Sequence, residues 1–233
     1  MAHRFHRDFR PTFHPERLSD PLHWRRPRRI GVSFTGDLFD TAITDEQIAS
    51  VFGVMAACPA HTFFVLTKQA ARMERWFARP NVQASVEHAR KAVVDAVEAD
   101  DAAANVWARW PLPNVAVGVS VSTAADLHRI DNLLCVPAAL RFISAEPLLG
   151  PLDLGRLRYH LVRPGENGVN WVVVAAESGP RARPVNLDWV RQIRDDCAEC
   201  DDALFALKDQ TKFLTLDGVR HAAIPSLTPP PAP

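Results

Sequence analysis

Six short runs of the sequence are apolar at nearly every position, rather than at every second position. Strands of this kind are typical of parallel sheets that are covered on both faces, because neither face meets water. The runs are Arg29–Phe34, Phe63–Lys68, Val115–Val121, Leu140–Ala145, Trp171–Ala176 and Ala203–Lys208. The sequence therefore predicts a parallel sheet of six strands.

Helical patterns separate these runs. The pattern from Thr44 to Ala57 opens with a threonine that can cap a helix and with Gln47, which can complete a capping box. The other patterns are Ala70–Phe77, Thr123–Leu134 and Leu187–Cys200, with Thr123 and Asn186 as candidate caps. Alternating strands and helices predict βαβ units, whose right-handed crossovers place the helices on one side of a curled sheet. We expect an α/β fold, a partial (β/α) TIM-type barrel with outer helices; a doubly wound open sheet is the alternative.

The domain division follows from composition along the chain. A length of 233 residues with 47% hydrophobic residues fits one domain with a sizeable core. We expect a basic N-terminal segment over 1–28, the barrel domain over 29–214 and a Pro-rich disordered tail over 215–233. Within the domain, the Ala-rich residues 82–108 form a helical insertion that is either a lid or an outer packing layer.

Charge and hydropathy exclude several classes of protein. Lys and Arg together number 27 and Asp and Glu also number 27, so net charge gives no general attraction to nucleic acid or membranes. No stretch approaches the roughly 18 uninterrupted apolar residues that a membrane span requires. The N terminus lacks the apolar segment of a secretory signal, and four cysteines do not make a disulfide scaffold. We expect a soluble protein of the reducing cytoplasm.

Two local features have alternative interpretations. Arg25, Arg26, Arg28 and Arg29 near Trp24 make a positive segment that either contacts phosphates or is simply solvated. Cys197 and Cys200 form a lone CxxC on a predicted helix, whereas structural zinc takes four ligands. We interpret this pair as two small core residues and predict no metal site.

Polar residues follow each of the six runs. Ligands of parallel α/β folds bind beyond the carboxyl ends of the strands, so these side chains are expected to converge on one rim. Glutamates there can hold an amine or act as bases, and lysines can bind a carboxylate or phosphate. The alternative is that the glutamates and lysines only neutralise each other. The candidates are Asp37, Lys68, Ser120, Ser122, Glu146, Glu177, Ser178 and Lys208.

Five segments, in this order, resemble a known family. They are HPERLSDPLHWRRPRRIGVSFTGDLFD (His14–Asp40), HTFFVLTKQAARM (His61–Met73), LPNVAVGVSVS (Leu112–Ser122), RFISAEPLLGPLDL (Arg141–Leu154) and NWVVVAAESGPRARPVNLDWVRQIRDDC (Asn170–Cys197). Together they resemble the phage-derived gene product thirty-seven/sixty-eight family, a three-cysteine-motif family of unassigned function that is similar to radical S-adenosylmethionine enzymes.

The resemblance implies a cofactor and a missing segment. Family members carry an N-terminal Cys-x-x-Cys-Tyr-Ala segment for an iron–sulfur cluster, and this segment and the first barrel strand are absent here. The resemblance assigns S-adenosylmethionine to a cavity lined by Ser120, Glu146, Glu177 and Lys208, with the turn at Ser178 beside it. The family's Gly-Gly-Glu-Ser-Gly is Ala175 to Gly179 here, its Phe-Lys-Gln-Trp-Gly ending is reduced to Leu207 to Gln210, and Ser122 stands where an acidic residue is common.

Three functions are consistent with these residues. The first is an enzyme of the radical S-adenosylmethionine type recorded without its cluster segment. The second is a degenerate, non-catalytic barrel that binds a ligand or partner, and the third is a nucleic-acid-associated module that uses the basic segment. A barrel without one strand has two unpaired edges, so we also expect self-association.

Overall fold

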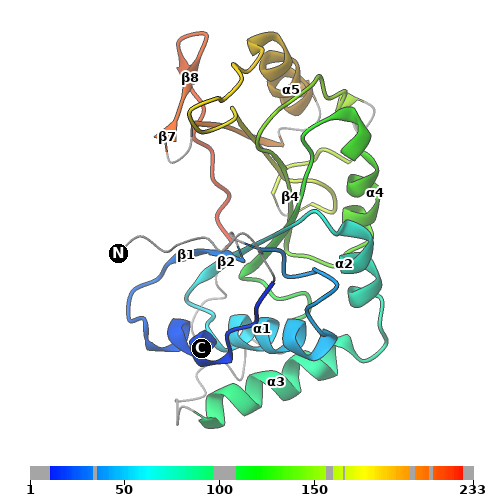
Figure 1. Cartoon of the computed structure of the whole chain (residues 1–233), viewed down its shortest axis with the longest axis vertical. Helices are drawn as coiled ribbons and strands as arrows, with labels where there is room; N and C mark the ends of the chain where they lie inside the picture. The colour runs from blue at the N-terminus through cyan, green and yellow to red at the C-terminus, as the bar shows by residue number, and fades with distance from the viewer. Residues whose placement is uncertain are drawn as a thin grey trace.

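The computed structural model describes residues 11–33, 36–96, 109–155, 160–164, 166–199, 203–209 and 212–227. Six parallel strands lie side by side in sequence order and curl into half of a barrel (Figure 1). They are β1 (Arg29–Val32), β2 (Thr62–Thr67), β3 (Val115–Ser120), β4 (Leu140–Ala145), β5 (Trp171–Ala175) and β6 (Leu204–Asp209). The predicted partial TIM-type barrel is therefore confirmed.

The helices surround the convex side of this sheet (Figure 1). They are α1 (Asp45–Ala57), α2 (Ala70–Phe77), α3 (Val82–Ala96), α4 (His128–Leu134) and α5 (Leu187–Glu199), with the short 3-10 turns η1 (Pro15–Arg17), η2 (Asp20–His23) and η3 (Ala124–Asp126). The predicted capping box of α1 is present, because the Gln47 N–H donates to Thr44 Oγ1 at 3.3 Å and the Thr44 N–H donates to Gln47 Oε1 at 2.9 Å. No helix in the described ranges has the length and apolarity to cross a membrane.

Strands β3, β4 and β5 are buried on both faces, which explains why they are apolar at nearly every position, whereas the residues of β1 are exposed or half-buried. Successive side chains of a strand point to opposite faces. Val117, Ile143, Val172 and their neighbours pack against the helices in the main core. The residues between them form a second cluster on the concave face, composed of Ala116, Leu140, Phe142, Trp171, Val173 and Ala206.

The C-terminal segment covers this concave face. The Trp171 indole N–H donates to the Ala223 carbonyl at 2.9 Å, and Ala222 forms an antiparallel bridge with Ala206. Ile224 and Leu227 pack against the concave cluster. The covering is favourable because a half-barrel would otherwise leave its inner apolar surface in water, at a cost of about 25 cal/mol per Å².

Residues 215–227 therefore correct the predicted disordered tail, which began at residue 215. Strands β8 (Thr215–Leu216) and β9 (Val219–Arg220) form a hairpin whose central residues, Asp217 and Gly218, have φ values of 50° and 81°. Two positive φ angles are what a type I′ hairpin turn requires. Residues 228–233 lie outside the described ranges.

Of the two sheet edges, the one at β6 is paired. Strand β7 (Lys212–Phe213) returns antiparallel along β6, and the Leu207 N–H donates to the His221 carbonyl at 3.2 Å. In the described chain, β1 pairs with β2 alone. The expectation of two unpaired edges is thus wrong for β6, and only the β1 edge still supports self-association.

Helix α3 is an outer packing layer over α1. A Cβ atom on Gly53 would come within 2.7 Å of the Arg90 backbone nitrogen, so the two helices approach too closely for any side chain there. Val82, Val86 and Val94 are buried in the contact. The described part of the 82–108 insertion therefore packs rather than forming a lid, and residues 97–108 lie outside the described chain.

Candidate functional site

The candidate site lies on the concave side, where strands β3 to β6 end. Ser120 pairs in register with Ser144, and Ala175 pairs with Lys208, so the ends of these strands form one rim. Ser120 and Ser144 alternate with residues of the main core and therefore face the concave side. Both serines are buried.

Glu146 and Lys208 meet at this rim. Glu146 Oε1 lies 3.5 Å from Lys208 Nζ, and about a quarter of each side chain is exposed (26% and 29%). This is longer than the roughly 2.7–2.9 Å of a good charge-assisted hydrogen bond. Glu146 Oε1 is buried and, despite the nearby ammonium, has no hydrogen-bond partner in the described chain. Ser144 Oγ donates to the other oxygen, Oε2, at 3.4 Å.

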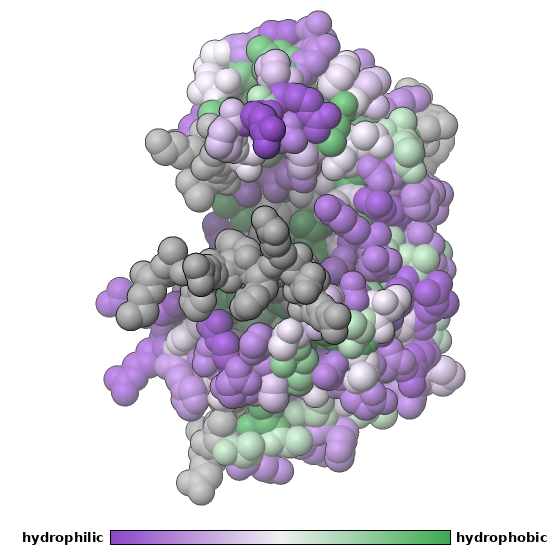
Figure 2. Space-filling model, viewed as in Figure 1, coloured by the Kyte–Doolittle hydropathy of each residue, from purple (hydrophilic) through white to green (hydrophobic). Residues whose placement is uncertain are grey.

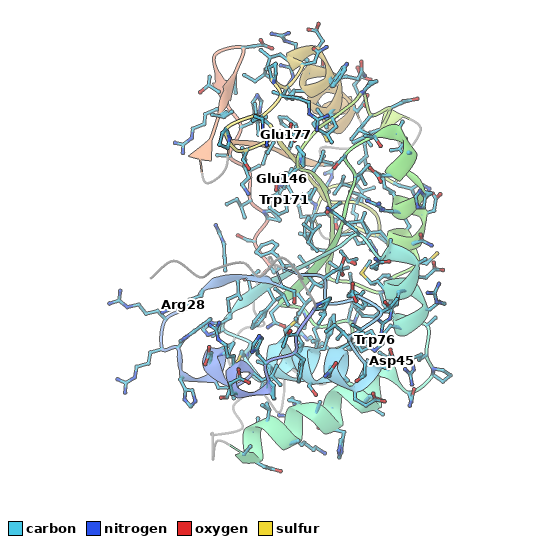
Figure 3. All side chains as sticks on the ribbon, viewed as in Figure 1. Arg28, Asp45, Trp76, Glu146, Trp171 and Glu177 are labelled. Atoms are coloured by element: carbon cyan, nitrogen blue, oxygen red, sulfur yellow. The ribbon has the colours of Figure 1, made fainter. Side chains whose placement is uncertain are left out.

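Glu177 has a different partner. Arg183 Nε and Nη2 donate to its two oxygens at 2.7 and 3.1 Å, and the Arg183 backbone N–H donates at 3.0 Å. The Arg183 guanidinium lowers the pKa of Glu177 to about 2. Glu146 and Glu177 follow neighbouring strands and both lie in the upper half of Figure 3. The two predicted carboxylates nevertheless have separate cations.

Other predicted residues hold loops. Asp37 accepts hydrogen bonds from Thr67 Oγ1 at 2.6 Å, from the Lys68 N–H at 2.8 Å and from the Phe39 N–H at 2.9 Å, which ties the segment after β1 to the end of β2. The Ser122 N–H donates to Asp126 Oδ2 at 3.1 Å. The Lys68 and Ser178 side chains are exposed. The structure thus brings together Ser120, Glu146 and Lys208 among the eight candidates.

Sequence reasoning missed Ser144 and Arg183. The signal for Ser144 was available, because it precedes Glu146 by two residues and alternation therefore places both on one face. Arg183 lies in an irregular loop, where no periodicity fixes which way a side chain points. The Gly179-Pro180 pair marks the turn that returns the chain towards Glu177.

The described cysteines do not fit an iron–sulfur cluster. Cys58 ends α1, Cys135 follows α4 and Cys197 lies on α5, whereas cluster ligands come from a tight loop. Burial raises the pKa of the Cys58 thiol to about 12, which disfavours the thiolate that binds iron. Cys197 is buried, as predicted for a core residue, and Cys200 lies outside the described ranges. Within those ranges no group of three metal-ligating side chains gathers.

Comparison with known proteins identifies a family. The model of a family described as "Protein of unknown function (DUF5131)" matches residues 2–223. No curated protein matches the chain, and no solved structure does.

Proposed function

The chain belongs to the DUF5131 family, proteins of unknown function, and on that premise we propose that its concave rim binds a small ligand through an α-amino acid group. Glu146 receives the ligand's ammonium group and Lys208 receives its carboxylate. S-adenosylmethionine, which the sequence resemblance implies, carries such a group. The phage origin and the radical-enzyme relationship rest on the same resemblance.

The buried Glu146 Oε1, which accepts no hydrogen bond in the described chain, carries this proposal. A buried acceptor without a donor costs free energy of about 1–3 kcal/mol, and more when it is charged. An ammonium group brings three donors and can satisfy Oε1 better than Lys208 does at 3.5 Å. Lys208 is then free to pair with the carboxylate of the same ligand, so the rim exchanges one long ion pair for two short ones.

Neighbouring groups suit the rest of such a ligand. The hydroxyl groups of Ser120 and Ser144 face the same side as Glu146 and can donate or accept hydrogen bonds. Val173 and Ala206, in register with Ser144 on the adjoining strands, are buried beneath the C-terminal segment and support the rim with an apolar layer. Few polar groups above an apolar surface are typical of small-molecule sites.

The proposal is for binding, and no catalytic step is assigned. The described cysteines are unsuited to an iron–sulfur cluster. The radical chemistry that the resemblance implies is therefore not assigned to these residues. The free thiols of Cys58 and Cys135 support the cytoplasmic location that the sequence predicts, since disulfides are rare there.

Isothermal titration tests the proposal. We expect S-adenosylmethionine and S-adenosylhomocysteine to bind, and methylthioadenosine, which lacks the amino acid group, to bind about tenfold or more weakly. Glu146→Gln and Lys208→Met should each weaken binding about tenfold or more, because each removes a charge-assisted hydrogen bond of about 1.5–3 kcal/mol.

Glu166→Gln is the matched control. It removes the same charge from an exposed glutamate that precedes β5, at the opposite end of the strand from the rim. Unchanged affinity in both rim variants would sink the proposal, as would methylthioadenosine binding as tightly as S-adenosylmethionine. Thermal melts of all three variants show whether a loss of affinity reflects a loss of folding.

A further inference from the structure

We propose that the β1 edge of the sheet binds a single strand of nucleic acid, independently of the rim. Four arginines contact the phosphates: Arg25, Arg26, Arg28 and Arg29. The cavity beside them takes an unpaired base. Figure 3 shows Arg28 at the left edge of the molecule, next to the start of β1.

The arginines of this edge differ from many others in being uncompensated. All four are exposed, and within the described chain none of them forms an ion pair with a carboxylate. By contrast, Arg79 pairs with Asp45, and Arg129 pairs with Asp126 at 2.8 Å. Four guanidinium groups without a carboxylate partner, within five residues, form a dense positive strip, and planar guanidinium groups match phosphate geometry.

The strip is held in place rather than loosely attached. The Arg28 carbonyl accepts a hydrogen bond from the Thr62 N–H at 2.9 Å, and Arg29 lies in register with Thr62 as the first residue of β1. The Trp24 N–H donates to the Pro21 carbonyl at 3.3 Å at the end of η2. Because the backbone is already ordered, binding loses less conformational entropy.

Aromatic rings accompany these charges. The Arg28 guanidinium lies 4.5 Å from the centroid of the Trp24 ring, and the His61 ring packs 5.8 Å from that centroid. Proteins that bind single strands without sequence preference combine a positive groove with aromatic side chains on which bases stack. Trp24 and its stacked arginine provide both elements in one place.

A cavity of about 620 Å³ opens beside the strip. Phe13, His14 and Trp24 line it together with Ile30 and Gly31 of β1. Its volume falls within the range of about 300–1,000 Å³ that is usual for ligand pockets. A base of a single strand can enter such a cavity, whereas a base inside a duplex is stacked and hidden.

The acidic residues of the cavity are already engaged. Asp20 pairs with Arg17 at 3.3 Å. Asp37 accepts hydrogen bonds from Thr67, Lys68 and Phe39, as described above. Both carboxylates therefore have donors within the protein, and neither forms an ion pair with the arginines of the strip.

Fluorescence anisotropy with labelled oligonucleotides of about twelve nucleotides tests this inference. This length lies within the usual site sizes of proteins that bind single strands. We expect oligothymidylate and oligouridylate to bind more tightly than a duplex of the same length. The logarithm of the affinity should fall against the logarithm of salt concentration with a slope of about −3, because each phosphate contact to a single strand contributes about −0.7. This slope corresponds to a loss of about 50-fold between about 50 and about 200 mM salt.

The variant that tests the strip carries Arg25→Gln, Arg26→Gln, Arg28→Gln and Arg29→Gln together, and it should lose binding and the salt slope. The matched control carries the same four charge changes at exposed arginines elsewhere, namely Arg75, Arg109, Arg181 and Arg220. Equal loss in the two variants would overturn the proposal, since it would reduce the effect to net charge. Binding to anionic vesicles or heparin without binding to either oligonucleotide would also overturn it. The S-adenosylmethionine titration of both variants reports separately on the rim.

Discussion

The two edges of the half-barrel use arginine in opposite ways. Beside β6, Arg191 pairs with Asp188 and Asp217 at 2.7 and 2.8 Å, and Arg194 reaches Asp217 at 2.9 Å. These pairs fasten the β8–β9 hairpin to α5. Beside β1, the arginines of the 25–29 strip have no carboxylate partner in the described chain. Figure 2 shows hydrophilic side chains projecting from the left of the molecule on that side.

The difference teaches what each set of charges does. An arginine that is already paired with a carboxylate holds an irregular segment in place, and the carboxylate neutralises its charge. An unpaired, exposed arginine adds little to stability, and its charge remains available to a partner. We therefore expect changes at the β6 side to affect folding and changes at the β1 edge to affect binding.

The largest expected effect comes from Trp171, which supports the covering of the concave face. Trp171→Ala removes a buried ring and the hydrogen bond to Ala223, and should lower the free energy of unfolding by about 3–5 kcal/mol. Urea denaturation measures this loss. Trp24→Ala at the other edge should cost less than about 2 kcal/mol, because Trp24 is only partly buried. Equal costs for the two tryptophans would break the comparison.

A smaller effect is expected at the hairpin turn. Gly218 has a φ of 81°, which a residue with a Cβ adopts at a cost, so Gly218→Ala should destabilise the protein by about 1 kcal/mol. Gly150→Ala is the control, since a Cβ there meets nothing within 4 Å and the backbone is not in the left-handed region. The difference between the two thermal melting temperatures tests the hairpin, and similar values would mean that the turn is not formed.

Acid should weaken the ion pairs of Asp217 on the β6 side, whereas the arginines of the β1 edge have no such carboxylate partner in the described chain. Arg191 and Arg194 lower the pKa of Asp217 from its usual 3.8 to about 2. A carboxylate with a depressed folded-state pKa contributes stability above its unfolded pKa, and the contribution is lost as pH falls through the folded value. Asp217→Asn should therefore flatten the decline in stability between about pH 4 and pH 2. Urea midpoints at several pH values measure this, and an unchanged decline would argue against the pairing.

The smallest effect on stability is expected at the β1 edge itself. Arg25→Gln should change the free energy of unfolding by less than about 0.5 kcal/mol, because it alters an exposed side chain that has no carboxylate partner among the described residues. The same change should reduce the salt slope of oligonucleotide binding by about 0.7. A loss of stability like that of Gly218→Ala would show that the strip supports the fold.

The sequence predicted the parts of the fold that repeat. Apolar runs and helical spacing reflect burial on two faces, which is a local pattern, and Leu140–Ala145 and Ala70–Phe77 match β4 and α2 at both ends. The hairpin was not predicted, because the Pro-rich composition after Ile224 indicated a disordered tail and the predicted tail began at residue 215. That boundary placed Asp217-Gly218 inside the tail. That dipeptide is itself a strong hairpin signal.

The position of the rim was predictable from the sequence, but the pairing of its charged side chains was not. Strand ends placed Glu146 and Lys208 on one rim, because parallel strands all end at the same side. The choice of partner depends on long side chains and on a loop, so Arg183 could not be assigned to Glu177 from spacing. The sequence was consistent with two roles for these charges, contact with a ligand or mutual neutralisation. The distance of 3.5 Å between Glu146 Oε1 and Lys208 Nζ is compatible with either role.

The segment that covers the concave face is synthesised after all six parallel strands of the half-barrel. Trp171 and Phe142 have to wait for residues 221–227 before their inner sides leave water. Domains generally fold as units while the chain emerges from the ribosome, and exposed apolar surface promotes aggregation during that interval. A chain interrupted shortly after β6 would have every strand of its half-barrel and still present an uncovered apolar face to chaperones and proteases.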